Sequence, residues 1–395
     1  MRPLDGVLVV SLEQAVAVPY ATRLLADLGA RVIKVERPDG GDFARHYDPA
    51  CGEVSSYFAW TNVGKESLAI DLKHPLGAAV VRDLVARADV VTCNLSPGAA
   101  RRLDLSADTL RARHPALVVA ELSSYGDGGP YRDRKAFDAL VQSETGLIAA
   151  TGTGPSMARA GISVADIAAG VQLHAAILAA LLRRHRTGEG TTLRLTLMEA
   201  LAEWMHQPLL YALGTGTNPA REGAHHPTIA PYGPVACKTG AVHLAVQNDG
   251  QWRRLCALAG RPDLADKYPT VTERVTHRAE VHAELQPYFD SRDADAALTA
   301  LDAADVPAAR TREVADLRTH PQLAARDRWQ AVPVPGGTAP MLQPPSTPTP
   351  GTGPPPPSPP RAPTPTPSSP GSVTPRPPSA TQAPSETPPP PSPME

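Results

Sequence analysis

The chain of 395 residues lacks the sequence signals of several protein classes. Its four cysteines form no CxxC pair and have no histidine partners at zinc-ligand spacing, so neither a disulfide framework nor a metal site is expected. A net charge of −2, with both signs intermixed, argues against a nucleic-acid-binding protein, which would carry a basic patch. The composition favours a cytoplasmic protein and leaves small anionic ligands open.

No secretory or membrane segment is expected either. The N-terminal residues MRPLDG run directly into a strand-like segment and contain no apolar core of a signal peptide. The most apolar segment, residues 167–182, is shorter than the roughly 20 residues of a bilayer span, and arginines follow it at once. We therefore predict a buried core helix there and no membrane partner.

The first half of the chain alternates short β-rich segments with helical patterns, which is typical of a parallel sheet. Strands are expected at residues 7–12, 31–36, 68–72, 89–93, 117–122 and 191–196. We predict an α/β fold with a doubly wound, mostly parallel, Rossmann-like large domain. A nicotinamide cofactor is not expected, because the first turn reads EQAVAVP where dinucleotide-binding folds have G-x-G-x-x-G.

The pattern changes after residue 224. Two strands joined by a turn, followed by helical segments, predict a small α+β domain over residues 225–320. The large domain would span residues 1–224 and be rejoined by about 321–343. Residues 344–395 contain 23 of the 45 prolines, so this tail is expected to be disordered. A ligand for an SH3-like or WW-like partner, a passive tail and a gene-model error stay open for it.

One stretch, GISVADIAAG at residues 161–170, sets a carboxylate between two glycines at the start of the apolar helix. Asp166 is interpreted as the helix N-cap, because an Asp side chain accepts hydrogen bonds from amides of the first turn. The positive end of the helix dipole would also keep this carboxylate ionised, which suits a nucleophile that attacks an activated acyl group. From this stretch alone, cap and nucleophile both stay open.

Several segments, taken together and in order, resemble the class III CoA-transferases, which include formyl-CoA, carnitine and 2-methylacyl-CoA racemase-like members. They are residues 3–6, 24–38 (LLADLGARVIKVERP), 62–73, 94–98, 161–170, 183–190 and 230–233. The resemblance implies transfer of CoA from an acyl-CoA to a carboxylic acid. Asp166 would be the nucleophile, through mixed-anhydride and aspartyl-CoA thioester intermediates. It also implies no tightly bound cofactor, with coenzyme A as part of substrate and product, and an interlocked homodimer.

The same resemblance implies a set of coenzyme A contacts, which are Arg37, Leu72, Asn94, Leu95, Arg102 and Lys135. Arg37 and Arg102 would hold the nucleotide phosphates, because the guanidinium fork suits phosphate. Asn94, with Leu72 and Leu95, would frame the adenine and pantetheine. Lys135 would lie near the active-site entrance.

Four further residues are predicted to contact the acid substrate. The segment GGDFARHY at residues 40–47 looks most like the branch that acts on mesaconate, citramalate or itaconate, and Arg45 would pair with a distal carboxylate. Asp138 would lie at the entrance, or would only be an early-helix acid stabilised by the helix dipole. His226 or Tyr232 would orient the acid, in a segment that replaces the glycine-rich flap of some members.

Two alternative functions stay open from the sequence. One is racemisation of 2-methylacyl-CoA thioesters, in which an Asp and a His exchange the α-proton. The other is a noncatalytic scaffold that presents the proline-rich tail.

Overall fold

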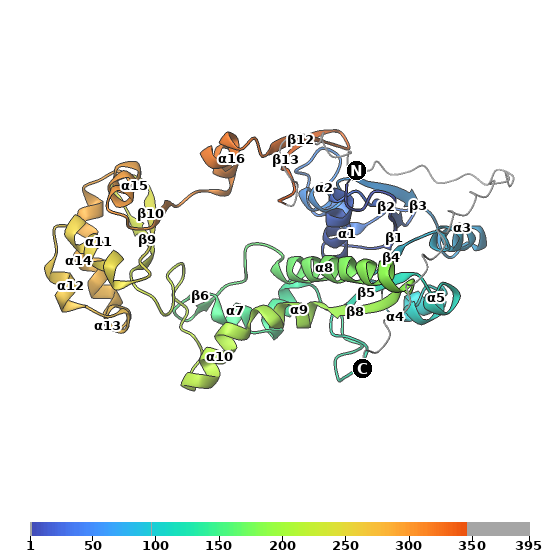
Figure 1. Ribbon diagram of the computed structural model, residues 1–395, viewed down its shortest axis with the longest axis horizontal. Coiled ribbons are helices and arrows are strands. Elements are labelled where there is room, and N and C mark those ends of the chain that lie inside the picture. The colour runs from blue at the N-terminus through green and yellow to red at the C-terminus, as the bar shows by residue number, and fades with distance from the viewer. Residues whose placement is uncertain (1, 96, 346–395) are drawn as a thin grey trace, which may run out of the picture.

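The computed structural model describes residues 2–95 and 97–345, so most of the predicted tail lies outside the described residues. Its largest element is a six-stranded sheet of order β3-β2-β1-β4-β5-β8, parallel throughout (Figure 1). The strands are β1 (Leu8–Leu12), β2 (Arg31–Glu36), β3 (Lys65–Ala69), β4 (Val90–Cys93), β5 (Val118–Ser123) and β8 (Thr191–Thr196). The predicted parallel α/β fold is confirmed. Ligands of such sheets bind where the strand order reverses, here between β1 and β4.

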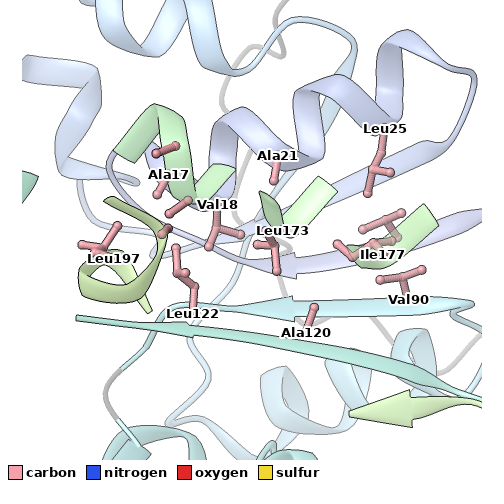
Figure 2. Close-up of a cluster of buried hydrophobic side chains, with 14 of the residues drawn as sticks. Ala17, Val18, Ala21, Leu25, Val90, Ala120, Leu122, Leu173, Ile177 and Leu197 are labelled. Carbon is pink, nitrogen blue, oxygen red and sulfur yellow. The ribbon is translucent and has the colours of Figure 1, made fainter. Parts of the chain in front are cut away.

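Helices cover both faces of this sheet. They are α1 (Ala17–Asp27), α2 (Ser56–Thr61), α3 (Pro75–Val85), α4 (Pro97–Arg102), α5 (Ala107–Arg113), α6 (Asp138–Glu144), α7 (Leu147–Ala150), α8 (Val164–Thr187) and α9 (Leu197–Trp204). Successive strand residues point to opposite faces. Val9 accordingly belongs to the apolar cluster that contains α1 and α8, whereas Val10 belongs to the cluster that contains α3 and α5. Figure 2 shows the first cluster, with Leu173 and Ile177 of α8 over the sheet.

The predicted core helix is α8. By length and composition it would be long enough to cross a membrane, but Leu173 and Ile177 are fully buried against the sheet domain. The helix lies close to α1 at Gly170, where a Cβ atom would stand 2.8 Å from the carbonyl oxygen of Ala17. Glycine at this position therefore allows the backbones of the two helices to approach.

A second core forms from residues 235–306. Its elements are the antiparallel strands β9 (Tyr232–Ala236), β10 (Ala241–Ala245) and β11 (Ala308–Arg310), with helices α11 (Asp249–Leu258), α12 (Asp263–Lys267), α13 (Val271–Thr276), α14 (Arg278–Asp290) and α15 (Ala294–Ala303). Figure 1 shows this unit set apart from the large sheet, beyond α10 (His206–Thr215).

The chain then returns to the sheet domain through α16 (Pro321–Ala325) and a hairpin of β12 (Trp329–Val334) and β13 (Gly337–Leu342). Val334 and Ala339 of this hairpin pack against Phe58 of α2. The remaining short elements are η1 (Phe43–His46), β6 (Gly152–Thr153), β7 (Ser156–Met157) and η2 (Val314–Thr319).

Candidate active site

Two cavities open beside the carboxyl ends of the central strands. The first, which we name the Asp166 cavity, has a volume of about 610 Å³ and is lined by Asp166, Asp138, Gln14 and Asn94 among others. The second, which we name the Arg37 cavity, has a volume of about 570 Å³. Gln14 lines both cavities. They therefore adjoin at the turn after β1, which is the switch point of the sheet.

Asp166 is the third residue of α8 and does not cap the helix. The N-cap residue is Ser163, whose side chain makes no capping hydrogen bond. The amide of Ala165 donates to Oδ1 of Asp138 at 2.8 Å, so the cap comes from α6. The prediction that Asp166 is the cap was wrong, because Asp166 already lies within the first turn. Its carboxylate has no hydrogen-bond or ion-pair partner within residues 2–95 and 97–345 and borders the cavity.

A side-chain amide holds Asp138 in this position. Nε2 of Gln142 donates to Oδ2 of Asp138 at 2.7 Å, which confirms that the two residues share one helix face. Oε1 of Gln142 accepts from the amide of Ala160 at 2.9 Å. Asp138 and Gln142 together fix the segment that leads into α8, and with it the position of Asp166.

The protonation of Asp166 differs from the expectation. Burial, and then the nearby charge of Asp138, raise the pKa of Asp166 to about 7. The sequence predicted that the helix N-terminus would keep this carboxylate ionised, but the loss of water around the group outweighs the helix dipole. Near neutral pH, both forms of Asp166 are present in comparable amounts.

Asn94 joins the two strands at the switch point. Its Oδ1 accepts from the amide of Gln14 at 3.0 Å, and its Nδ2 donates to the carbonyl of Gln14 at 2.8 Å. Asn94 thus lines the Asp166 cavity and fixes the backbone of Gln14. The sequence analysis missed Gln14. Its place directly after the first strand, at the switch point, was the signal that could have found it.

The Arg37 cavity brings together four of the predicted coenzyme A contacts, which are Arg37, Leu72, Leu95 and Arg102. Arg37 donates to the carbonyl of Gly41 at 3.2 Å. Neither Arg37 nor Arg102 has a carboxylate partner among the residues that the structure describes. Two unneutralised guanidinium groups on one cavity suit an anion such as a phosphate.

Arg45 does not reach the Asp166 cavity. Its guanidinium forms two hydrogen bonds with Glu36, at 2.9 and 2.6 Å, and lies 3.8 Å from the centre of the Phe58 ring. Only 6% of the residue is exposed. The guanidinium is therefore not free to pair with a distal substrate carboxylate, as the sequence predicted, because Glu36 already binds it.

Of the other predicted substrate residues, Asp138 lines the Asp166 cavity, whereas the remaining two do not in the single chain. His226 and Tyr232 belong to the small unit, where their rings stack with centroids 5.1 Å apart. Neither lines the Asp166 cavity. Lys135 is exposed, next to Ala136 in the cavity wall.

The rest of the Asp166 cavity is aromatic and hydroxyl-bearing. Tyr47 and Tyr57 meet edge to face there, with ring centroids 5.5 Å apart. Burial, and the charges of Asp42 and Asp166, raise the pKa of Tyr47 to about 12, so its hydroxyl stays a hydrogen-bond donor. Among the residues that the structure describes, no Lys, Arg or His lines this cavity. Recognition of an anionic group by this lining must therefore use hydroxyl and amide groups.

Comparisons with known proteins point to one family. The model of CoA-transferase family III matches residues 4–364. The chain is 38% identical over 338 residues to a succinate–glutarate CoA-transferase of Agrobacterium fabrum, covering 82% of this chain and 84% of that protein. It is 34% identical over 347 residues to a succinyl-CoA:mesaconate CoA-transferase of Haloarcula marismortui, covering 85% and 87% of the two proteins. A crystal structure of a CAIB/BAIF family protein from Brucella suis has a TM-score of 0.79 at 34% identity, covering 88% of this chain and 92% of that one.

Proposed function

The chain belongs to CoA-transferase family III and is a CoA-transferase, and we propose that it moves CoA to a small dicarboxylic acid through covalent intermediates on Asp166. The observation that carries this proposal is the unpartnered Asp166 carboxylate on a cavity that adjoins the Arg37 cavity, where two guanidinium groups have no carboxylate partner among the described residues. A nucleotide in one cavity and a thioester in the other would share the wall at Gln14. This arrangement suits a long, bent ligand such as an acyl-CoA.

The proposed reaction begins with attack of the ionised Asp166 carboxylate on the donor thioester carbonyl. The carbon–sulfur bond breaks, the CoA thiolate leaves, and a mixed anhydride joins the acyl group to Asp166. The thiolate then attacks the Asp166 carbonyl, which releases the donor acid and leaves an aspartyl-CoA thioester. Each step replaces one activated acyl bond with another, so covalent catalysis divides a difficult exchange into easier ones.

The second half of the reaction repeats these steps in reverse. The acceptor carboxylate attacks the aspartyl-CoA carbonyl, and the thiolate leaves again as a second mixed anhydride forms. The thiolate then attacks the acceptor carbonyl, giving the new acyl-CoA and the free Asp166 carboxylate. The acyl-CoA phosphates would bind Arg37 and Arg102, since guanidinium groups bind phosphate oxygens with charge-assisted hydrogen bonds.

The names of the relatives support a dicarboxylic acid as the acceptor. They refer to succinate, glutarate and mesaconate, which carry two carboxyl groups each. The Asp166 cavity offers the hydroxyl groups of Tyr47, Tyr57 and Ser123 for the second carboxylate. We propose that these hydroxyls take the role that the sequence assigned to Arg45.

Racemisation is less well supported than transfer. The two-residue mechanism requires a histidine opposite the aspartate, and no histidine of the described segments, 2–95 and 97–345, lines the Asp166 cavity. The names of the relatives also describe transfer. The scaffold alternative depends on the tail and leaves the two cavities without a role.

We also propose that the protein acts in the cytoplasm as a homodimer. Leu209, Leu210 and Leu213 of α10 are 50%, 66% and 73% exposed in the single chain. An exposed apolar cluster of this kind is typical of a protein–protein interface. Light scattering of the purified protein tests this, and a monomer at micromolar concentration would contradict it.

A transfer assay tests the proposed function. Acyl-CoA donors, including succinyl-CoA, are incubated in deuterated buffer with mono- and dicarboxylic acids, and the CoA products are identified by mass. We expect transfer to a dicarboxylic acid, reduced about 1,000-fold or more in Asp166→Asn. The matched control is Asp133→Asn, whose side chain is 89% exposed, and it should transfer at the wild-type rate. Deuterium uptake into the donor acyl group without transfer would contradict the proposal.

A further inference from the structure

We propose that Asp42 is a positioning residue of the transfer reaction, because it fixes the turn that forms the common wall of the two cavities. This turn comprises residues 13–16, between β1 and α1. The inference rests on the proposed function, since it assumes that acyl-CoA occupies both cavities. Asp42 is 2% exposed and borders the Arg37 cavity beside this turn.

The turn contributes to both cavities. Glu13 and Gln14 line the Arg37 cavity, and Gln14, Ala15 and Val16 line the Asp166 cavity. A small shift of this turn would therefore displace the contacts of the nucleotide and of the thioester together. A misplacement of about 1 Å in such a positioning element can reduce a reaction rate on the order of 100-fold.

The turn contains a backbone conformation that is unfavourable without support from neighbouring groups. Ala15 has φ = 65°, in the left-handed region that residues other than glycine rarely adopt. Such a conformation persists only where the surrounding structure imposes it. The amide of Ala15 donates to Oδ1 of Asp42 at 3.2 Å, and Asn94 holds the adjacent Gln14. Asp42 is thus the side chain that binds Ala15 directly.

Asp42 is itself fixed on both sides. Its Oδ2 accepts from Nζ of Lys34 at 2.7 Å, and its Oδ1 also accepts from the amide of Ala44 at 3.0 Å. The amide of Asp42 donates to Oε2 of Glu36 at 2.8 Å. The carboxylate therefore has no freedom to follow the turn if the turn moves.

The charge behind the turn is balanced within the protein. Lys65 donates to Oε1 of Glu13 at 2.6 Å, and Lys34 lies 3.4 Å from the same oxygen. Burial alone would raise the pKa of Glu13, but the charges of Lys65 and Lys34 lower it to about 2. Glu13, the first residue of the turn, and Asp42, which binds Ala15, thus belong to a single buried ionic cluster. This cluster stands where dinucleotide-binding folds have a glycine-rich turn.

Asp42→Ala removes the carboxylate that accepts a hydrogen bond from the amide of Ala15. Asp42→Asn keeps an oxygen that can accept this hydrogen bond. We expect kcat/KM for acyl-CoA to fall about 10- to 100-fold in Asp42→Ala, with both a higher KM and a lower kcat. Asp42→Asn should be less impaired than Asp42→Ala, because it keeps the oxygen that binds Ala15 although it loses the ion pair with Lys34. Adding Ala15→Gly to Asp42→Ala should restore part of the loss, because glycine adopts positive φ without strain.

The matched control is Asp89→Ala. The Asp89 carboxylate likewise accepts from a backbone amide, that of Leu8 in β1 at 2.7 Å, and pairs with Arg184 at 2.9 Å. It does so at the opposite end of the strand from the cavities. Asp89→Ala should lower the melting temperature while leaving kcat and KM unchanged at temperatures where the variant is folded.

Two outcomes would overturn the inference. One is an Asp42→Ala variant whose kinetic constants match those of Asp89→Ala, and the other is an Asp42→Asn variant as impaired as Asp42→Ala. If Asp42→Ala does not fold, the single variant Asp42→Asn is compared with the double variant Asp42→Asn/Ala15→Gly. The double variant should be at least as active as the single variant, and a lower activity would overturn the inference. Absence of transfer by the wild-type protein would instead contradict the proposed function.

Discussion

Oδ1 of Asp138 accepts a hydrogen bond from the amide of Ala165, so one acidic residue caps the helix that carries another, Asp166. Because Asp138 caps the helix, the Asp166 carboxylate is not needed to accept hydrogen bonds from the first-turn amides. The cap also brings a second carboxylate, that of Asp138, near Asp166. That acid contributes to the raised pKa of Asp166, about 7, after burial. The same contact therefore positions the proposed nucleophile and adjusts its protonation.

The raised pKa predicts a pH-dependent rate. Only the ionised carboxylate attacks the thioester, and the ionised fraction rises from roughly a tenth at pH 6 to nine-tenths at pH 8 for a pKa of about 7. We expect kcat/KM to increase about tenfold over this range. In Asp138→Asn, which removes the second acid and keeps a capping oxygen, the midpoint should move to lower pH. A rate that is independent of pH between 6 and 8 in the wild-type protein would contradict this prediction.

Ionisation of the buried Asp166 should also lower the free energy of unfolding of the protein. Its pKa in the folded protein, about 7, exceeds the value of 3.8 for the unfolded chain. The folded state therefore binds the proton more tightly, and stability is lost as pH rises from about 4 to 7. Asn does not ionise, so Asp166→Asn should raise the free energy of unfolding at pH 8 by about 1–3 kcal/mol. Urea denaturation at pH 8 and pH 4 measures this difference, which should shrink at pH 4; an equal difference at both values would speak against the mechanism.

The contact between α8 and α1 predicts a different effect at Gly170. A Cβ atom there would lie 2.8 Å from the carbonyl oxygen of Ala17, and this backbone group has no free rotation with which to move away. Gly170→Ala should destabilise the protein by about 1–2 kcal/mol, although alanine favours helices. It should also reduce activity, since Asp166 lies one turn earlier on the same helix face. Gly161→Ala is the control, because its Cβ would meet no atom within 4 Å. A fully active and stable Gly170→Ala would show that the helices can separate without cost.

Arg37 and Arg102 should act only on the nucleotide end of the donor. Arg37→Ala and Arg102→Ala should each raise the KM for acyl-CoA about 10- to 100-fold, the effect of losing a charge-assisted hydrogen bond. The corresponding acyl-pantetheine lacks the nucleotide, and its transfer rate should be the same in wild type and variants. Arg113→Ala, which removes an exposed arginine, is the control. Equal losses with both donors would place the two arginines outside the nucleotide site.

The large sheet was predictable because most of its strands contain short apolar runs that alternate with helices. The predicted start of β3, residue 68, lies three residues after the observed start at Lys65. The prediction missed Lys65 because it is a charged strand residue, whose ammonium group is buried against Glu13. Apolar periodicity does not detect a buried ion pair, because the partner is distant in sequence. The same limit explains Arg45, whose partner Glu36 could not be identified from the sequence.

The convergence of Arg37, Leu72, Leu95 and Arg102 on one cavity followed from a family resemblance and not from periodicity. The role of Asp138 as the cap of α8 was not predictable in the same way. It depends on how α6 packs beside α8, and 27 residues separate the two partners of that hydrogen bond. Local sequence rules assign a cap to the nearest Asp or Ser, which here selected the wrong residue.

The central claim is that Asp166 forms a covalent bond during transfer. The protein is mixed with an acyl-CoA donor without acceptor, quenched in acid, and analysed by intact-protein and peptide mass spectrometry. We expect an added mass of coenzyme A less one water, located on the peptide that contains Asp166 and absent from Asp166→Asn. An adduct on another residue, or transfer at an undiminished rate by Asp166→Asn, would contradict it.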